Sequence, residues 1–352
     1  MAREKQNNSL FQKAAENGCR MVGVEKGSRV VLICDDGNKE IAEAFRAAAE
    51  KVAGNGNMMV INLDEGKFGP RPIIELPESL KKALADFRPT ASLFIAANRE
   101  GEVTFRKPLI DFLTMGLHAA HGHSPGMMPD IMRSGMLTDH GMIVKVTEAV
   151  YGAIKKAKEF RITAPAGTDL RVWPSDRMSW VLEHSIMPGK WGNLPIGEIF
   201  TCPERVEGRM VVDGVLGDYF GQKFGSLEDV PVMILIRDSR AESISCPRIG
   251  VAHELQAYIA KDINGDRVGE VGFGTNVGIK DYIGNMLQDE KRSFHLAFGN
   301  PYPEKTGAKW ESFPRTHVDC CMRDCTIDII MRNGKTMKLM EGGRYTDAVL
   351  SG

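Results

Sequence analysis

Short apolar runs rich in Val and Ile recur through the first half of the chain, bounded by Gly, Asp, Asn or Pro. They occupy residues 28–34 (SRVVLIC), 57–63 (NMMVINL) and 91–97 (ASLFIAA). Runs of this length are typical of strands buried on both faces, as in a parallel sheet. Residues 38–54, between the first two runs, place apolar side chains at helical spacing before a closing glycine,. The pattern predicts a strand–helix–strand unit.

Two further segments of the first half have helical spacing, residues 79–87 and 148–160. From about residue 161 the pattern changes to strand-like pieces separated by glycine turns, and RNGKT (332–336) predicts a hairpin turn,. The best helical candidates there are residues 253–262 and 278–287.

These patterns predict an α/β fold in two domains. Residues 1–160 form an N-terminal α/β domain with a mainly parallel sheet, and residues 161–352 form a mostly β (α+β) domain. A length of 352 residues suits two domains of ordinary size,.

Composition narrows the class of protein. Apolar residues make up 43% and charged residues 26%, and 45 Lys and Arg balance 46 Asp and Glu. Such a balance favours neither a nucleic-acid partner nor an anionic membrane. The chain has no apolar run long enough to span a bilayer, and its polar first residues lack the apolar segment of a signal peptide,. We therefore expect a cytoplasmic protein with no membrane partner.

The seven cysteines are odd in number and show no small-scaffold spacing, which argues against a disulfide framework,. Cys320, Cys321 and Cys325 could form a metal or cluster site, but their spacing matches no standard pattern,. We favour buried thiols in a strand.

Two other patterns in the first half were weighed as ligand sites. The first strand is not followed by G-x-G-x-x-G or by a P-loop, so a purely structural α/β domain is favoured over a nucleotide-binding one,. His118, His121 and His123 are spaced closely enough to bind a metal,. The following Ser-Pro-Gly is a turn signal, so we favour a loop near a domain interface, with a role in lining a substrate cleft as an alternative.

Five metal-type side chains lie in Gly- or Pro-marked contexts of the second half. Glu198 ends an irregular NLPIG segment, a good place to aim a carboxylate, although a solvated turn residue is the plain alternative,. Glu270 lies in GEVGFGTN, where glycines mark close approach and a buried carboxylate needs a partner,. His295 lies in the apolar SFHLAF and could simply be a core histidine. His317 and Asp319 project from one strand face, as metal ligands or as a surface pair,.

Together these five are more ligands than one ion normally takes from protein and suit two ions that share a carboxylate. Imidazole and carboxylate without thiolate fit Zn, Co, Mn or Fe. Two such ions with a bridging water polarise an amide carbonyl and supply hydroxide. The ligand set predicts a two-metal hydrolytic site.

The order of these residues resembles peptidase family M29, the metallo-aminopeptidases that include aminopeptidases T and S. Residues 193–203 (NLPIGEIFTCP) match the family's first ligand segment, and residues 166–170 resemble the strand that opens its second domain. The remaining matches are Glu270, Asp289, Glu290, Lys291, His295, Gly299, Tyr302, His317 and Asp319. The resemblance covers about residues 160–345 well and the first half only loosely.

The resemblance implies an N-terminal α/β domain, a C-terminal catalytic domain and a homodimer. It implies two divalent ions held by five ligands: Glu198, Glu270, His295, His317 and Asp319. Tyr302 would stabilise the tetrahedral oxyanion or assist proton transfer, and a metal-shell carboxylate, for which we take Glu198, would pass a proton to the leaving amine. The substrate would be a peptide or a small molecule with an amide bond.

Two features differ from the typical peptidases. Gly197 stands where they carry a second Glu directly before the ligand Glu. Arg323-Asp324-Cys325 follows H-x-D as in the similar 2,5-dihydroxypyridine dioxygenases, which use one Fe(II) bound by two His and one carboxylate. Those enzymes carry His at the position of Glu270 and lack an equivalent of His295. We therefore predict a two-metal aminopeptidase or amide hydrolase, with the ring-opening dioxygenase and a non-catalytic scaffold as alternatives.

Overall fold

The computed structural model describes residues 2–312 and 316–351. The chain forms two compact units, Met1–Met142 with Glu183–Ile196 and Ile143–Leu182 with Gly197–Gly352. The backbone therefore passes between the units three times, whereas the sequence predicts a single boundary near residue 160. Helix α6 (His140–Ile154) explains part of the difference, because its Val146, Val150 and Ile154 are buried in the core of the second unit.

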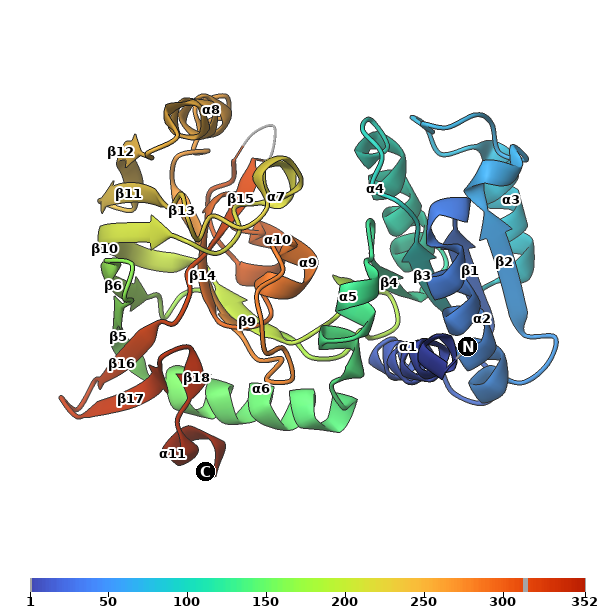
Figure 1. Cartoon of the computed structure of the whole chain (residues 1–352), viewed down its shortest axis with the longest axis horizontal. Helices are drawn as coiled ribbons and strands as arrows, with labels where there is room; N and C mark the ends of the chain where they lie inside the picture. Colours follow the sequence, from blue (N-terminus) through green and yellow to red (C-terminus); the bar gives the residue numbers. More distant parts are fainter. Residues whose placement is uncertain (1, 313–315, 352) are drawn as a thin grey trace. The chain divides into compact units, whose positions relative to one another are not determined.

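The first unit is built on a five-stranded sheet in which all neighbouring strands are parallel, in the order β2-β1-β3-β4-β8 (Figure 1). The strands are β1 (Val30–Cys34), β2 (Met58–Asn62), β3 (Ala91–Ile95), β4 (Ala120–His123) and β8 (Trp191–Asn193). The first three coincide with the predicted apolar runs. The expected α/β fold with a mainly parallel sheet is confirmed.

The helices of the first unit are α1 (Ala2–Met21), α2 (Lys39–Ala53), α3 (Glu78–Phe87), α4 (Val103–Asp111) and α5 (Pro129–Met132). Helices α2 and α3 confirm the predicted helices. Leu80 of α3 and Leu109 of α4 share a core with Val31 of β1. Helix α1 was not predicted, because its buried positions, such as Phe11 and Ala15, are separated by many polar residues.

The second unit consists mainly of two sheets (Figure 1). The eight-stranded sheet, antiparallel throughout, has the order β12-β11-β10-β6-β5-β16-β17-β18, and the five-stranded sheet has the order β15-β14-β13-β9-β7. The first contains β5 (Ala157–Thr163), β6 (Asp169–Pro174), β10 (Pro203–Val212), β11 (Val232–Arg237), β12 (Arg240–Ser245), β16 (Thr326–Met331), β17 (Thr336–Glu341) and β18 (Arg344–Tyr345). The second contains β7 (Val181–Glu183), β9 (Glu198–Thr201), β13 (Val268–Gly274), β14 (Phe294–Gly299) and β15 (His317–Cys321).

Side chains of both sheets meet in one apolar core, for example Ile162 and Val206 from the larger sheet and Phe273 and Leu296 from the smaller. The mostly β second half is confirmed. Its helices are short: α7 (Asp218–Phe224), α8 (Ile249–Ile259), α9 (Met286–Asp289), α10 (Pro303–Thr306) and α11 (Asp347–Leu350). The predicted hairpin joins β16 to β17, with Gly334 at φ +81°.

Three predicted elements were wrong in part. Residues 120–123 form strand β4 and not a loop, and their side chains are buried. The helix predicted for residues 148–160 ends at Ile154, because the alternation of buried and exposed positions after Ala157 suits a strand. Most of residues 278–287 is not helical, since the Asp289 carboxylate accepts hydrogen bonds from the backbone N–H groups of Ile283 and Gly284 and holds a turn.

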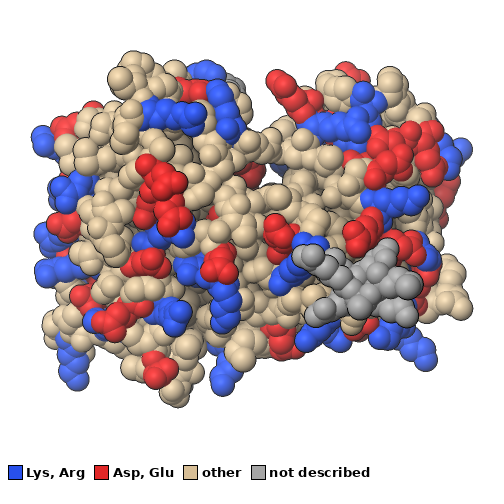
Figure 2. All heavy atoms as spheres, in the orientation of Figure 1, with Lys and Arg blue, Asp and Glu red and all other residues tan. Residues whose placement is uncertain are grey.

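Acidic and basic side chains lie beside one another over the face drawn in Figure 2, in keeping with the balanced charge count. Across residues 2–312 and 316–351, no helix is both long and apolar enough to cross a bilayer.

Candidate metal centre

All five predicted ligands lie on one face of the smaller sheet of the second unit, on the adjacent strands β15, β14, β13 and β9. His317 and Asp319 are two residues apart on β15, so both side chains project to one side,. The register places Asp319 opposite Ala297, Ala297 opposite Glu270, and Gly274 opposite Glu198. Side chains as far apart in sequence as Glu198 and Asp319 therefore converge because neighbouring strands carry them.

Most of the remaining positions on this face next to the ligands are small, and the large exception is Phe200, opposite Gly272. The small positions are Gly272, Gly274, Ala297 and Gly299. A Cβ atom on Gly272 would lie 2.0 Å from His295 Nε2, so the His295 ring rests directly against this glycine. The opposite face carries the large apolar side chains, such as Phe273 and Leu296. Because side chains alternate between the two faces of each strand, one face of the sheet forms the core and the other carries the site.

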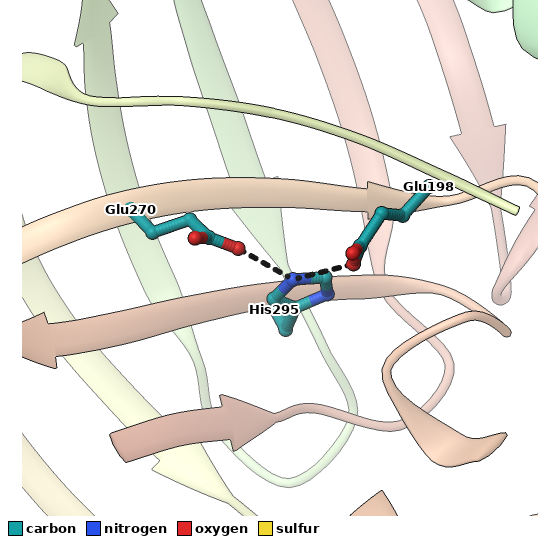
Figure 3. A group of neighbouring side chains, drawn as sticks. All are labelled: Glu198, Glu270 and His295. Atoms are coloured by element: carbon teal, nitrogen blue, oxygen red, sulfur yellow. Dashed lines mark hydrogen bonds and ion pairs between the residues drawn. The ribbon is translucent and has the colours of Figure 1, made fainter. Parts of the chain in front are cut away.

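One group of ligands is formed by Glu198, Glu270 and His295, all buried (Figure 3). The two carboxylates approach the imidazole from either side. His295 Nε2 lies 3.2 Å from Glu270 Oε1 and 3.7 Å from Glu198 Oε2. This spacing brings three ligand atoms close enough to bind one ion.

The second group is formed by Glu270, His317 and Asp319. His317 Nε2 lies 3.2 Å from Asp319 Oδ1 and 3.9 Å from Glu270 Oε2. His317 Nδ1 donates a hydrogen bond to the carbonyl oxygen of Asn300 at 3.0 Å, which directs Nε2 towards the carboxylates,. Glu270 belongs to both groups, one oxygen to each histidine. The donor set therefore fits two neighbouring ions that share a carboxylate.

The carboxylates of the centre set the protonation of its two histidines. Burial by itself lowers the pKa of His295, but the hydrogen bond to Glu270 and the charge of Glu198 raise it to about 9. The pKa of His317 rises to about 10 in spite of burial, chiefly through Asp319. Burial raises the pKa of Asp319, but the positive charge of His317 holds it at about 2. Without a metal, protons on the two histidines offset the negative charge.

Sequence reasoning assigned no role to two residues that lie in the centre, Glu290 and Lys291. Lys291 Nζ lies 2.5 Å from Glu198 Oε1 and 2.6 Å from Glu290 Oε1. Both side chains are buried. A lysine and a glutamate after a helix signal ordinarily indicate a solvated turn. The signals for a place in the centre were their position shortly before the strand of His295 and their match to the family motif.

Tyr302, the predicted oxyanion donor, packs its ring against His317, with 4.8 Å between ring centroids, and lies 5.9 Å from the ring of Phe200. It follows β14 in a left-handed conformation, with φ +49°. The phenol side chain therefore borders the second ligand group. The metal-binding and catalytic roles of all these residues remain predictions.

Gly197, which replaces the typical glutamate, has φ +120°, and a Cβ atom there would lie 3.0 Å from the backbone N of Asn276. The backbone at this point excludes a larger side chain. Both the positive φ and the close Asn276 backbone therefore favour glycine at position 197.

The histidines of the first unit form a separate network. His121 Nδ1 lies 2.7 Å from Ser92 Oγ, and His121 Nε2 lies 3.2 Å from His123 Nδ1. Burial lowers the pKa of His121 to about 3 and that of His123 well below its ordinary value, so both are neutral. Within the described part of the chain, neither they nor His118 joins a group of three close metal-type ligands.

Cys320, Cys321 and Cys325 are buried free thiols, as predicted. Burial raises the thiol pKa of all three, so they stay protonated. They do not add thiolate ligands to the centre.

Comparison with known proteins places the chain in one family and finds solved structures with a similar fold. The family model described as NicX, 2,5-dihydroxypyridine 5,6-dioxygenase, matches residues 129–337. Wild-type AmpT from Thermus thermophilus has a TM-score of 0.70 and 17% identity, covering 96% of this chain and 99% of that one. The 2,5-dihydroxypyridine dioxygenase from Pseudomonas putida KT2440 has a TM-score of 0.64 and 15% identity, covering 97% and 98%. No curated protein matches the sequence. The resemblance to aminopeptidase T is confirmed at the level of the fold.

Proposed function

Because the chain belongs to the NicX (2,5-dihydroxypyridine 5,6-dioxygenase) family, whose fold aminopeptidase T shares, we propose that it is a metal-dependent enzyme and that the metal ligands decide its reaction. The proposed reaction is the hydrolysis of an amide bond, at the N-terminus of a peptide or in a small molecule. The fold supports an enzyme of either kind. The choice of hydrolysis depends on the ligand geometry.

The observation that carries the proposal is that Glu270 belongs to both ligand groups. Each group holds one imidazole and two carboxylates, the mixed donor set of a two-metal hydrolytic site,. A single-iron oxygenase site of the two-His, one-carboxylate type needs both imidazoles on one ion. Among the described residues, no close group contains both His295 and His317. The arrangement favours two ions over one.

Each residue has a distinct part in the proposed reaction. The Glu198–Glu270–His295 and Glu270–His317–Asp319 groups would hold the ions, which would polarise the scissile carbonyl and lower the pKa of bound water. Tyr302 beside His317 would donate its phenol hydrogen to the developing oxyanion,. Asn300 keeps His317 in one tautomer through its carbonyl oxygen,.

The second candidate is the ring-opening dioxygenase, which the family match favours. The tripeptide Arg323-Asp324-Cys325 gives it little further support. The Arg323 side chain pairs with Glu228 at 2.6 Å and stacks on Tyr282, and Cys325 is buried. These contacts account for the tripeptide as part of the turn that follows β15.

Metal analysis of protein purified without added metal, combined with two assays, tests the proposal. We expect two ions per chain and release of the dye from an aminoacyl p-nitroanilide. One iron per chain with oxygen uptake in the presence of 2,5-dihydroxypyridine would contradict hydrolysis and establish the dioxygenase. A protein without bound metal, whose stability does not change on chelation, would indicate a non-catalytic scaffold.

A further inference from the structure

Lys291 is a fixed cation inside the candidate metal centre. Its Nζ atom lies 2.5 Å from Glu198 Oε1 and 2.6 Å from Glu290 Oε1, and its side chain is 1% exposed. Surface lysines normally keep the ammonium group in water. An ammonium group buried between two carboxylates is therefore held in place by their charges.

This cation acts unequally on the two ligand groups. Glu198 belongs only to the group with Glu270 and His295, and it uses one oxygen for Lys291 while the other faces His295 at 3.7 Å. In the other group, Asp319 is paired with His317. A metal ion at the first group must therefore compete with an ammonium group that is paired with one of its ligands. The second group feels the Lys291 charge at Asp319, and there an ion also displaces the proton of His317.

The competition follows from simple electrostatics. A dication bound by Glu198 would lie a few ångströms from the ammonium and be repelled by it, in a site from which water is largely excluded. Lys291 also occupies an oxygen that would otherwise donate to the ion. Glu290 holds the ammonium beside Glu198, and its own negative charge offsets part of the repulsion,.

We propose that Lys291 makes the two metal positions unequal. The Glu270–His317–Asp319 position binds its ion first and tightly, and the Glu198–Glu270–His295 position fills only at higher metal concentration. The inference rests on the proposed two-metal centre and adds regulation to it, since full occupancy then depends on the supply of metal.

Titration of chelator-treated full-length protein with Mn²⁺ tests this, with free Mn²⁺ measured by electron paramagnetic resonance. The variants are Lys291→Met and Lys291→Gln, the second keeping a hydrogen-bond donor should the first fail to fold. Lys338→Met is the control, because Lys338 lies at the surface and pairs with Glu341. We expect two unequal affinities in the wild type. In the Lys291 variants the weaker affinity should rise by at least roughly tenfold and the stronger should stay within about threefold, as expected when a nearby charge is removed.

The outcomes separate this inference from the proposed function. Two equal affinities in the wild type, or a weaker affinity that falls or stays unchanged in both Lys291 variants, would overturn the role of Lys291 and leave the two-metal centre intact. One ion in the wild type and two in the variants would support the role of Lys291 while contradicting a two-metal wild-type enzyme. One ion in every protein would overturn both.

Discussion

Glu270 is the residue on which the centre depends most, because each of its oxygens faces a different histidine, at 3.2 Å from His295 and 3.9 Å from His317. No other predicted ligand belongs to both groups. His317 has the next most specific position, since its Nδ1 is already bound to a backbone carbonyl and only Nε2 can serve a metal,. These two residues give the sharpest tests at the residue scale.

Replacement of His317 by Ala should abolish activity and remove the ion of the Glu270–Asp319 group. The reason is that two carboxylates without the imidazole bind a transition metal much more weakly. Metal content by elemental analysis measures the effect. His253→Ala is the matched control, because His253 is exposed on α8. Full metal occupancy in the His317 variant would show that the site has been placed wrongly.

Tyr302→Phe should separate chemistry from metal binding. The phenyl ring keeps the packing against His317, while the loss of the hydroxyl removes a donor for the oxyanion. We expect turnover to fall by about 10²–10³-fold, the usual effect of one oxyanion donor, with metal content unchanged. Normal turnover would remove Tyr302 from the mechanism.

At the scale of the element, the site is made by a sheet in which one face packs large apolar side chains into the core and the other carries the ligands among mostly small residues. Glycines at 272 and 274 leave room for the His295 ring and for the turn at Lys291. The Cβ clearance at each position is below 3.0 Å, so a larger residue must displace its neighbour,. The glycines of β13 thus determine where the imidazole lies.

Gly272→Ala should therefore displace His295 and weaken metal binding at the Glu198–Glu270–His295 group alone. The other group, on β15 and the start of β13, should keep its affinity. Metal titration measures both. Gly250→Ala is the control, because nothing lies within 4 Å of a Cβ atom there. Equal weakening of the two affinities would mean that the substitution disturbs the whole sheet.

Gly197→Glu tests whether the glutamate of typical peptidases can be restored. We expect a loss of roughly 1–3 kcal/mol in unfolding free energy, since a non-glycine residue at φ +120° is strained and its Cβ meets Asn276,. Denaturant unfolding gives the free energy and the dye assay gives the activity. A stable variant with raised peptidase activity would show that the backbone adapts.

Much of this architecture can be predicted from local sequence patterns. The buried runs of β1, β2 and β3 and the helix α2 follow from apolar spacing, and the same-face placement of His317 and Asp319 follows from strand geometry,. The inclusion of β8 in the first sheet does not follow from local patterns, because its Trp191 pairs with His121, 70 positions earlier in the chain. No local period in the sequence encodes a pairing over this distance.

The candidate site was predictable in its ligands and not in its surroundings. Histidine and carboxylate residues in glycine-containing strands can be recognised in the sequence. The order of the family's motifs then indicated that they belong to one site. Lys291 and Glu290 match the family motif but were given no role, because a charged pair in sequence is usually solvated, and only the structure shows that these side chains are buried beside Glu198. The predicted homodimer remains a prediction.

At the scale of the whole molecule, the centre makes the stability of the folded protein depend on bound metal and on pH. The two histidines have pKa values of about 9 and about 10 in the metal-free protein, above the ordinary value of 6.5. A raised histidine pKa stabilises the folded state fully below the unfolded pKa, and the contribution is lost as pH rises through the folded value. Metal-free protein should therefore lose stability between about pH 6.5 and about pH 10.

Bound metal should remove this pH dependence, because a ligating imidazole cannot carry the proton. The melting temperature of chelated protein should fall across that range, while that of metal-loaded protein should stay nearly constant. Metal affinity should rise with pH over the same window, since fewer protons must be displaced. Thermal melts at pH 6.5, 8 and 9.5, with and without Mn²⁺, measure both effects, and His317→Ala should flatten the metal-free curve. Parallel curves for the chelated and loaded proteins would mean that His295 and His317 are not the groups that metal binding deprotonates.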